Sequence, residues 1–281
     1  MPNEGSSLSG RRVLITGAAR GIGAALARRL HDRGARVALA GIEPHLLEEV
    51  ASSCGGAPWQ SCDVTDRDEV EAAVSTAVDA FGGLDVVVAN AGVAAQLPII
   101  GGNPEVMERT LQVNVMGVYN TLRAAGPHIS HDRGYALAVS SLAAALHLPL
   151  LGAYCASKAA VEALGDSLRA ELRPSGARVG VAYFGELDTD MTSRGFGTQA
   201  AAKLTGGMPL MRPAKLDVGI DALERGIARR SRRIVAPRWV AGLLPTRMLV
   251  QPFVERALER RLAAALAVAR EEDAPLTTPQ P

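Results

Sequence analysis

The chain has 281 residues, a length that suits a single large domain with a sizeable buried core. Its 30 Lys and Arg residues almost balance its 29 Asp and Glu residues, so no charge excess is available to bind a nucleic-acid backbone or an anionic membrane. The three cysteines, Cys54, Cys62 and Cys155, lack metal-ligand spacing; we interpret them as small buried side chains in a reducing compartment and predict no metal site.

The N-terminal residues 1–10 are polar and lack the basic and apolar regions of a signal peptide. No apolar run approaches the ~20 residues that span a bilayer. We therefore expect a cytoplasmic protein with a flexible N-terminus and no transmembrane segment.

Short apolar runs rich in Val, Leu and Ile alternate with longer segments of helical period, which predicts parallel strands joined by crossover helices. The predicted strands cover residues 12–16, 36–40, 59–62, 84–89, 135–140, 178–184 and 233–236. The runs at 86–89 and 136–139 lack polar alternation, as expected of strands covered on both faces. We therefore predict an α/β fold with a doubly wound, seven-stranded parallel sheet in a single domain, residues 11–240.

A glycine-rich turn at residues 16–23 follows the first predicted strand and opens an Ala-rich amphipathic segment that reaches Arg33. Gly17, Gly21 and Gly23 would let the backbone approach a pyrophosphate, and the helix N-terminus would point free N–H groups at it. Tight turns also use glycine, but the strand before and the helix after favour dinucleotide binding.

Polar residues also follow the third and fourth predicted strands, at the edge where an open parallel sheet binds ligands. Asp63 could accept a hydrogen bond from an adenine amine, while Asn90 and Gly92 could form the floor beneath the two riboses. Either polar side chain could instead cap a following turn. The glycine turn nearby favours contact with a ligand.

Tyr154 and Lys158 lie four residues apart in a segment, 153–173, of helical periodicity, so both project from one face. A free tyrosine titrates near ~10, and lowering that pKa by ~3 units requires about 4 kcal/mol, within reach of a partly desolvated lysine and an oxidised nicotinamide ring. Ser141 ends the fifth strand and could bond the substrate oxygen, and Asn114 could hold a water that relays protons from Lys158.

Two further regions stand apart. Residues 192–213 are rich in Gly, Ala and Met without a clear period, and form either a mobile flap over the substrate or an ordinary surface insertion. Residues 241–270 are predicted to be a helical extension, in which 253–270 carries one apolar stripe that could cover the substrate mouth, a second subunit or a membrane surface. Residues 271–281 are expected to be a disordered tail.

Together these motifs resemble the short-chain dehydrogenase/reductase family: Thr-Gly-x-x-x-Gly-x-Gly at 16–23, Asn-Ala-Gly at 90–92, Asn114, Ser141 and Tyr-x-x-x-Lys at 154–158. The resemblance extends from about residue 11 to residue 236. It implies a Rossmann fold, with Tyr154 as general acid/base, Lys158 as pKa modulator and ribose ligand, Ser141 as substrate orienter and Asn114 as relay. It also implies a homodimer or homotetramer built partly through the helices that contain Asn114 and Tyr154.

The expected cofactor is NAD or NADP. The residues expected to bind it are Thr16, Gly17, Ala19, Arg20, Gly21, Ile22, Gly23, Gly41, Glu43, Asp63, Val64, Asn90, Ala91, Gly92, Tyr154, Lys158, Gly185, Leu187 and Thr189.

The sequence departs from the family pattern in two places. Residues 184–189 read Phe-Gly-Glu-Leu-Asp-Thr where the family usually has Pro-Gly-x-x-x-Thr, so Phe184 frees a backbone N–H and brings an aromatic ring near the nicotinamide. The second strand ends in Gly41 and Ile42, which carry neither the Asp typical of NAD-preferring relatives nor the Arg typical of NADP-preferring ones. Arg20 could pair with a 2′-phosphate, but Glu43 would repel it, which favours NAD.

The residues expected to contact the substrate are mostly small or apolar: Ala143, His147, Leu148, Leu151, Phe184 and Met191. They predict a lipophilic secondary alcohol or ketone, such as a steroid, terpenoid, long-chain or aryl carbonyl compound. His147 could bond a substrate oxygen or face water. The alternative is a catalytically silent dinucleotide-sensing or scaffold protein of the same fold, which would have no need for an activated phenol.

Overall fold

The computed structural model describes residues 8–189, 191–192, 198–207, 212–272 and 276–277. A seven-stranded sheet forms the centre of the molecule, with its strands in the order β3-β2-β1-β4-β5-β6-β7 and every pair parallel. This arrangement confirms the predicted doubly wound Rossmann fold. The strands are β1 (Arg12–Thr16), β2 (Arg36–Gly41), β3 (Trp59–Ser61), β4 (Val86–Ala89), β5 (Tyr135–Val139), β6 (Arg178–Phe184) and β7 (Arg233–Ala236), each within two residues of its predicted bounds.

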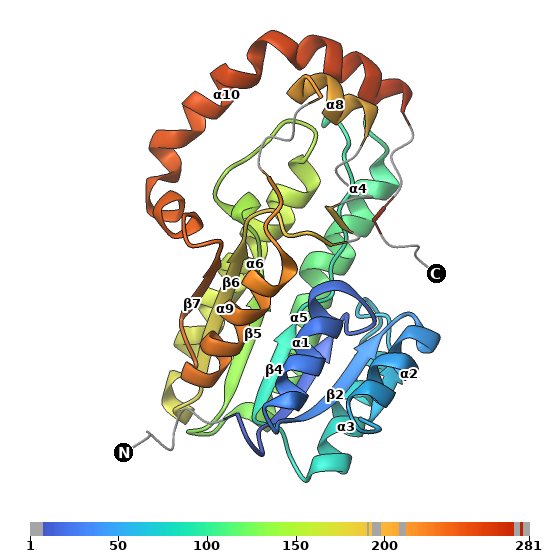
Figure 1. Ribbon diagram of the computed structural model, residues 1–281, viewed down its shortest axis with the longest axis vertical. Coiled ribbons are helices and arrows are strands. Elements are labelled where there is room, and N and C mark those ends of the chain that lie inside the picture. Colours follow the sequence, from blue (N-terminus) through green and yellow to red (C-terminus); the bar gives the residue numbers. More distant parts are fainter. Residues whose placement is uncertain (1–7, 190, 193–197, 208–211, 273–275, 278–281) are drawn as a thin grey trace.

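Helices cover both faces of the sheet (Figure 1). One face is covered by α1 (Gly21–Asp32), α2 (Pro44–Ser53) and α9 (Leu216–Arg229), and the other by α3 (Arg67–Phe81), α5 (Gly117–Ile129) and α6 (Gly152–Glu171). Along β1, Val13 and Ile15 enter the first hydrophobic cluster and Leu14 enters the second, so successive residues face opposite layers and all are buried. Burial on both sides therefore explains why the strands are apolar throughout.

The remaining helices are shorter or lie outside these layers. They are α4 (Pro104–Leu111), η2 (Gln112–Met116), η3 (Leu142–Ala144), η4 (Arg173–Ser175), α8 (Gln199–Thr205) and α10 (Val240–Glu271). No helix within the described ranges is both long and apolar enough to cross a membrane.

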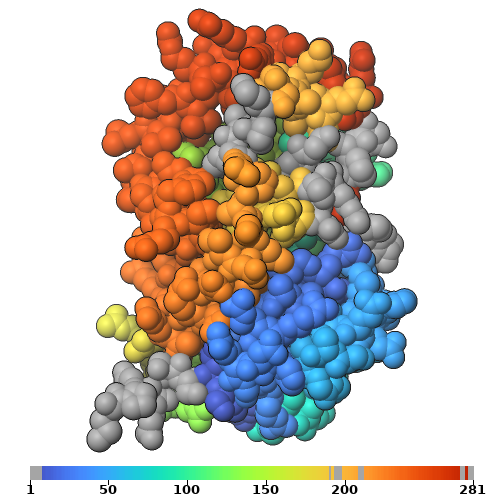
Figure 2. All heavy atoms as spheres, in the orientation of Figure 1, coloured from blue at the N-terminus to red at the C-terminus, as the bar shows by residue number. Residues whose placement is uncertain are grey.

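The C-terminal helix α10 arches over the end of the molecule above α8 (Figure 1), and Figure 2 shows their side chains packed into one layer. The structure contains the predicted apolar stripe: Leu258, Ala265 and Ala269 are buried in a cluster with Leu204 of α8 and with Leu150. The stripe thus packs against the chain's own α8, within the region 192–213 expected to be a flap. Residues 193–197 and 208–211 of that region lie outside the described residues.

Both ends of the described chain are more ordered than the sequence predicts. Leu8 is buried in the core, and the Gly10 N–H donates to the Gly34 carbonyl at 2.8 Å, so residues 8–10 are packed rather than flexible. In the expected disordered tail, Thr277 is also buried: its N–H donates to the Ala94 carbonyl and its hydroxyl accepts from the Ala94 N–H, both at 3.0 Å. Paired backbone hydrogen bonds hold this residue in place. The other residues of both predicted termini, 1–7, 273–275 and 278–281, lie outside the described residues.

Candidate active site

A cavity of about 620 Å³ opens at the carboxyl ends of β1, β2, β4, β5 and β6. Of the residues predicted to bind the cofactor, all but two line it: Gly17, Ala19, Arg20, Gly21, Ile22, Gly41, Glu43, Asp63, Val64, Asn90, Ala91, Gly92, Tyr154, Lys158, Gly185, Leu187 and Thr189. The exceptions, Thr16 and Gly23, lie behind the glycine turn and shape it from there.

The glycine turn is built around a contact that only glycine permits. Gly17 has a φ of +64°, and a Cβ placed there would lie 2.7 Å from the Ala91 Cα atom. Asn90 holds the turn from the other side, since its Nδ2 donates to the Thr16 and Gly17 carbonyls at 3.0 and 3.1 Å. The resulting surface is bare backbone at the N-terminus of α1, where free N–H groups suit a pyrophosphate.

Thr16 and Gly23 act within the protein. The Thr16 hydroxyl accepts from the Asn90 and Ala91 N–H groups at 3.2 and 3.4 Å, which ties the end of β1 to the loop after β4. At Gly23 a Cβ would lie 2.1 Å from the Gly17 carbonyl oxygen, so this glycine lets α1 pack directly against the turn. Both residues are thus engaged in packing, and neither lines the cavity.

Two ion pairs lie in the cavity wall near the glycine turn. Arg20 pairs with Glu43, each side chain about a quarter exposed. Asp63 accepts from Arg109 Nη2 at 2.7 Å and from the N–H and hydroxyl of Thr65 at 2.9 and 2.8 Å. The turn-capping alternative for Asp63 is thus realised, and Arg109, a lone basic residue of α4, could not be identified as its partner from the sequence.

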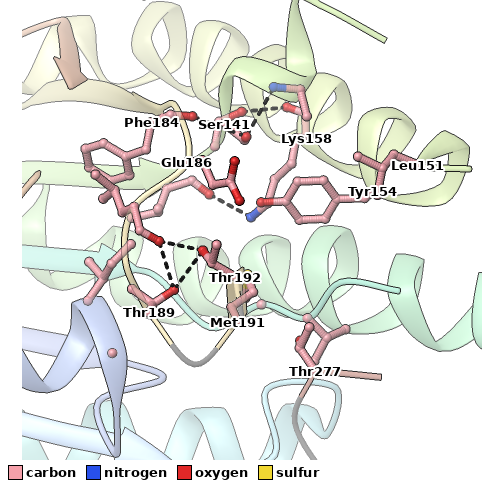
Figure 3. A pocket seen from close by; sticks show the side chains of 18 of the residues that line it. Ser141, Leu151, Tyr154, Lys158, Phe184, Glu186, Thr189, Met191, Thr192 and Thr277 are labelled. Carbon is pink, nitrogen blue, oxygen red and sulfur yellow. Dashed lines mark hydrogen bonds between the residues drawn. The ribbon is translucent and has the colours of Figure 1, made fainter. Parts of the chain in front are cut away.

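Tyr154, Lys158 and Ser141 meet in the other half of the cavity (Figure 3). Tyr154 and Lys158 come from the first turns of α6, and Lys158 Nζ lies 5.5 Å from the centre of the Tyr154 ring. The Ser141 hydroxyl, at the end of β5, forms a hydrogen bond with the Tyr154 phenol. Ser140 anchors α6 to β5 by donating to the Lys158 carbonyl at 2.8 Å. The fold therefore brings these three predicted residues together.

Burial dominates the protonation of this group. It raises the pKa of the Tyr154 phenol to about 12, against the opposing effect of the Ser141 hydrogen bond. It also lowers the pKa of the Lys158 ammonium to about 8, although Nζ donates to the Val139 carbonyl at 3.0 Å. The sequence-based expectation combined Lys158 with an oxidised nicotinamide ring; in the protein by itself the ammonium lies over the phenol ring, and desolvation of the phenol outweighs its effect.

Asn114 lies in the π-helical turn η2 between α4 and α5 rather than in a regular helix. Its Oδ1 accepts from the Val93 N–H at 2.8 Å, and its Nδ2 donates to the Val93 carbonyl and to Ser157 Oγ, both at 2.9 Å. The side chain is fully buried and does not line the cavity. Asn114 thus positions the loop after β4, and a Cβ at Gly92 would contact both Asn114 Oδ1 and Lys158 Nζ at 3.2 and 3.4 Å.

Five of the six predicted substrate residues line the cavity: Ala143, Leu148, Leu151, Phe184 and Met191. His147 does not. It is exposed, and its backbone N–H and carbonyl bond the side chain of Gln251 on α10 at 3.0 and 2.9 Å. The structure therefore agrees with the alternative in which His147 faces water.

Sequence reasoning missed several residues of the cavity wall. The additional polar ones include Gln96, Glu186, Thr192, Thr198 and Thr277, and α8 and α10 add Ala201, Ala202, Leu204, Thr205 and Val254. Glu186 could have been found, since it lies inside the segment 184–189 already singled out. The regions of α8 and α10 were expected as possible covers of the substrate site, but their individual lining residues and Thr277 left no local signal, because these contacts depend on how the C-terminal part folds back.

The chain shows clear similarity to known proteins. The sequence profile of the family described as short chain dehydrogenase matches residues 11–200. Glycine betaine reductase from Emericella nidulans is 38% identical over 207 residues, 72% of this chain but 16% of that protein. L-fucose dehydrogenase from Oryctolagus cuniculus is 35% identical over 63% of this chain and 62% of its own length. The chain therefore spans less than two thirds of both of these relatives.

Two further comparisons cover more of the matched protein. Short-chain dehydrogenase reductase 5 from Arabidopsis thaliana is 38% identical over 68% of this chain and 75% of its own length. The crystal structure of a dehydrogenase/reductase from Sinorhizobium meliloti 1021 superposes with a TM-score of 0.71 at 27% identity, covering 82% of this chain and 96% of that one. Both sequence and fold thus point to the same group of proteins.

Proposed function

The chain belongs to the short-chain dehydrogenase family, and from that premise we propose that it interconverts a lipophilic secondary alcohol and its ketone with a nicotinamide cofactor. Its relatives are named as dehydrogenases and reductases, so the protein is an oxidoreductase acting on CH–OH donors. The observation that carries the proposal is the meeting of Tyr154, Lys158 and Ser141 in the cavity that the glycine turn opens into.

In the proposed reaction, the alcohol carbon gives up a hydride and the alcohol oxygen gives up a proton, which together yield the ketone. A bound nicotinamide cofactor would accept this hydride, and in the reverse direction would supply it. Tyr154 exchanges the proton with the substrate oxygen, and Ser141 orients that oxygen. Lys158 places a cation over the phenol ring, which favours the phenolate when Tyr154 has given up its proton.

The cavity fits a dinucleotide. The turn at Gly17 and Gly21 presents backbone N–H groups at two positions that carry no side chain. Gly17 must be glycine here, because a Cβ would collide with Ala91. We propose that this turn holds the pyrophosphate and that Asn90 and Gly92 flank the riboses. On the nicotinamide side, we propose contacts from Lys158 and Thr189.

We propose that the preferred cofactor is NAD. Glu43 is already paired with Arg20, so a 2′-phosphate would have to displace a carboxylate to reach that guanidinium. Comparing KM values for the two cofactors tests this, and a clear preference for NADP would overturn it.

The lipophilic substrate follows from the wall of the cavity near Tyr154. Leu142, Leu146, Leu148, Leu151 and Met191 line this half of the site. The relatives named for L-fucose and for glycine betaine act, by those names, on polar compounds. A lipophilic substrate would therefore distinguish this chain from both of them. A spectrophotometric screen of lipophilic secondary alcohols with both oxidised cofactors tests the proposal; turnover confined to small polar polyols would refute it.

Two further features concern the cover of the substrate site and the assembly of subunits. We propose that α8 and α10 together cover the substrate end of the cavity, since Leu204 of α8 and Val254 of α10 both line it. We also propose a homodimer or homotetramer that uses the faces of α5 and α6, where Tyr119 is 43% exposed. Light scattering on the purified protein tests the second proposal, and a monomer at micromolar concentration would contradict it.

A further inference from the structure

Among the described residues, three carboxylates line the cavity, and they differ in their partners. Glu43 pairs with Arg20 and Asp63 pairs with Arg109, both near the glycine turn. Glu186 lies in the half that contains Tyr154, and its carboxylate has no ion pair or hydrogen bond with any residue in the described ranges. A partly buried carboxylate without a partner among the described residues is costly, and a hydrogen-bond donor on a bound ligand would offset that cost.

The backbone holds Glu186 in place. The Ala214 N–H donates to the Glu186 carbonyl at 2.9 Å, and the preceding residue, Gly185, donates to the Ala236 carbonyl at 2.9 Å. Hydrogen bonds to Ala214 and to Ala236, the last residue of β7, thus hold the segment after β6 in place. Figure 3 shows the carboxylate directed into the part of the cavity where the Tyr154 hydroxyl and Lys158 lie.

The segment that carries this carboxylate also contributes apolar side chains to the cavity wall. Phe184 and Leu187 flank it in sequence, and both are buried in the core while lining the same cavity. Burial raises the pKa of the Glu186 carboxyl, which agrees with loss of water around the group. In such surroundings a hydrogen bond to a charged acceptor is stronger than it is in water.

We propose that Glu186 recognises a hydrogen-bond-donating group on the substrate, either a protonated amine or a hydroxyl, placed near the reacting carbon. This inference rests on the proposed function and deepens it: the substrate has an apolar body and one donor group, and is not a pure hydrocarbon alcohol. A protonated amine gains the most because it also neutralises the carboxylate. An anionic substituent at the same place is repelled.

The test uses four secondary benzylic alcohols that differ only in the ortho substituent, which lies next to the reacting carbon: methyl, hydroxymethyl, aminomethyl or carboxylate. We expect wild-type kcat/KM to be highest for the aminomethyl compound, intermediate for hydroxymethyl and lowest for carboxylate. The aminomethyl compound should exceed the methyl compound about tenfold or more, since a charge-assisted bond to a desolvated carboxylate commonly contributes at least that factor.

Substitutions at Glu186 should change the order of these substrates. Glu186→Gln should reduce the preference for aminomethyl over methyl about tenfold while retaining activity on the methyl compound. Glu186→Lys should reverse the order and favour the carboxylate. Asp188→Asn is the matched control, because Asp188 is an exposed carboxylate two residues away that does not line this cavity, and it should leave the order unchanged.

Binding measured by calorimetry separates failure of this inference from failure of the proposed function. If none of the four alcohols is oxidised but the aminomethyl compound binds more tightly than the methyl compound, and Glu186→Gln removes the difference, the proposed substrate class is wrong and the role of Glu186 stands. Equal dissociation constants across the series would overturn the inference. So would a Glu186→Gln variant that alters only the affinities for oxidised and reduced cofactor, because the carboxylate would then balance the charge of the nicotinamide.

Discussion

Lys158 Nζ lies over the face of the Tyr154 ring, 5.5 Å from its centre, and donates to the Val139 carbonyl at 3.0 Å. The two side chains share a helix face, as their spacing requires, but the ammonium is held by β5 rather than by the phenol oxygen. Because burial keeps the pKa of Tyr154 near about 12, the neutral phenol is the stable form of this residue. The site therefore holds a proton on Tyr154 that a substrate alkoxide can accept.

Replacing Tyr154 by Phe should lower kcat by about two to four orders of magnitude, because the variant keeps the shape of the site but has no hydroxyl to exchange a proton with the substrate oxygen. The measurement is steady-state turnover of a lipophilic alcohol, with cofactor affinity followed by fluorescence. Tyr119→Phe, an exposed hydroxyl removed from α5, is the control and should retain full activity. Equal turnover by wild type and Tyr154→Phe would show that another group transfers the proton.

The buried ammonium of Lys158 should make stability depend on pH. Its pKa is about 8 in the folded protein against 10.5 in the unfolded chain, so the unfolded state binds more protons between these values and stability rises with pH across that window. Lys158→Met removes this dependence. Because the wild type alone contains the buried ammonium, the variant should gain on the order of 3 kcal/mol of stability relative to it below pH 8. This gap should shrink as the pH approaches 10.

Urea unfolding of the cofactor-free protein at several pH values measures this gap. The carbonyl of Val139 loses a donor in the variant, but that cost is independent of pH and leaves the slope unchanged. Lys203→Met removes an exposed lysine and should produce no comparable slope. A gap that stays constant from pH 7 to 10 would mean that Lys158 is not desolvated.

Glu43→Gln should shift cofactor use toward NADP. The change removes the carboxylate that occupies Arg20 and frees the guanidinium for a 2′-phosphate. We expect the ratio of kcat/KM for NADP to that for NAD to rise about tenfold, which corresponds to about 1.4 kcal/mol. Glu48→Gln, on the exposed side of α2, should leave the ratio unchanged, and an unchanged ratio in Glu43→Gln would rule out a role for this ion pair in cofactor choice.

Two Gly→Ala substitutions in helices should have opposite effects. Gly23→Ala in α1 would place a Cβ 2.1 Å from the Gly17 carbonyl, so it should displace the glycine turn and weaken cofactor binding about tenfold or more. Gly242→Ala in α10 meets no atom within 4 Å and should stabilise the protein by about 0.5–1 kcal/mol. Cofactor titration and thermal unfolding of both variants check the pair; normal affinity in Gly23→Ala would refute the close approach of α1 to the turn.

Removing the hydroxyl of Thr277 should loosen the loop after β4. In Thr277→Val the buried Ala94 N–H loses its acceptor, which costs about 1–2 kcal/mol locally. Hydrogen exchange at the Ala94 amide should accelerate about five- to thirtyfold. Thr277→Ser retains the hydroxyl and should restore protection, so equally fast exchange in both variants would indicate that the contact is lost in solution.

Local patterns in the sequence determined much of this protein. The bounds of β1, β6 and β7 were predicted to the residue, because strands buried on both faces are recorded as uninterrupted apolar runs. The glycine turn and the Tyr154–Lys158 pair were equally accessible, since each depends on spacing within one turn or one helix. The family resemblance then supplied the roles that spacing alone does not.

Only the tertiary structure decided which charges have partners. Asp63 is paired with Arg109 of α4, Thr277 reaches back to Ala94, and His147 is turned outward by Gln251, each contact joining segments more than 40 residues apart. Desolvation is a property of the same kind: it sets the pKa values of Tyr154 and Lys158 through atoms contributed by several elements at once. Hydrogen bonds and burial arise from proximity in space, and the order of residues along the chain records that proximity only where the partners are also neighbours in sequence.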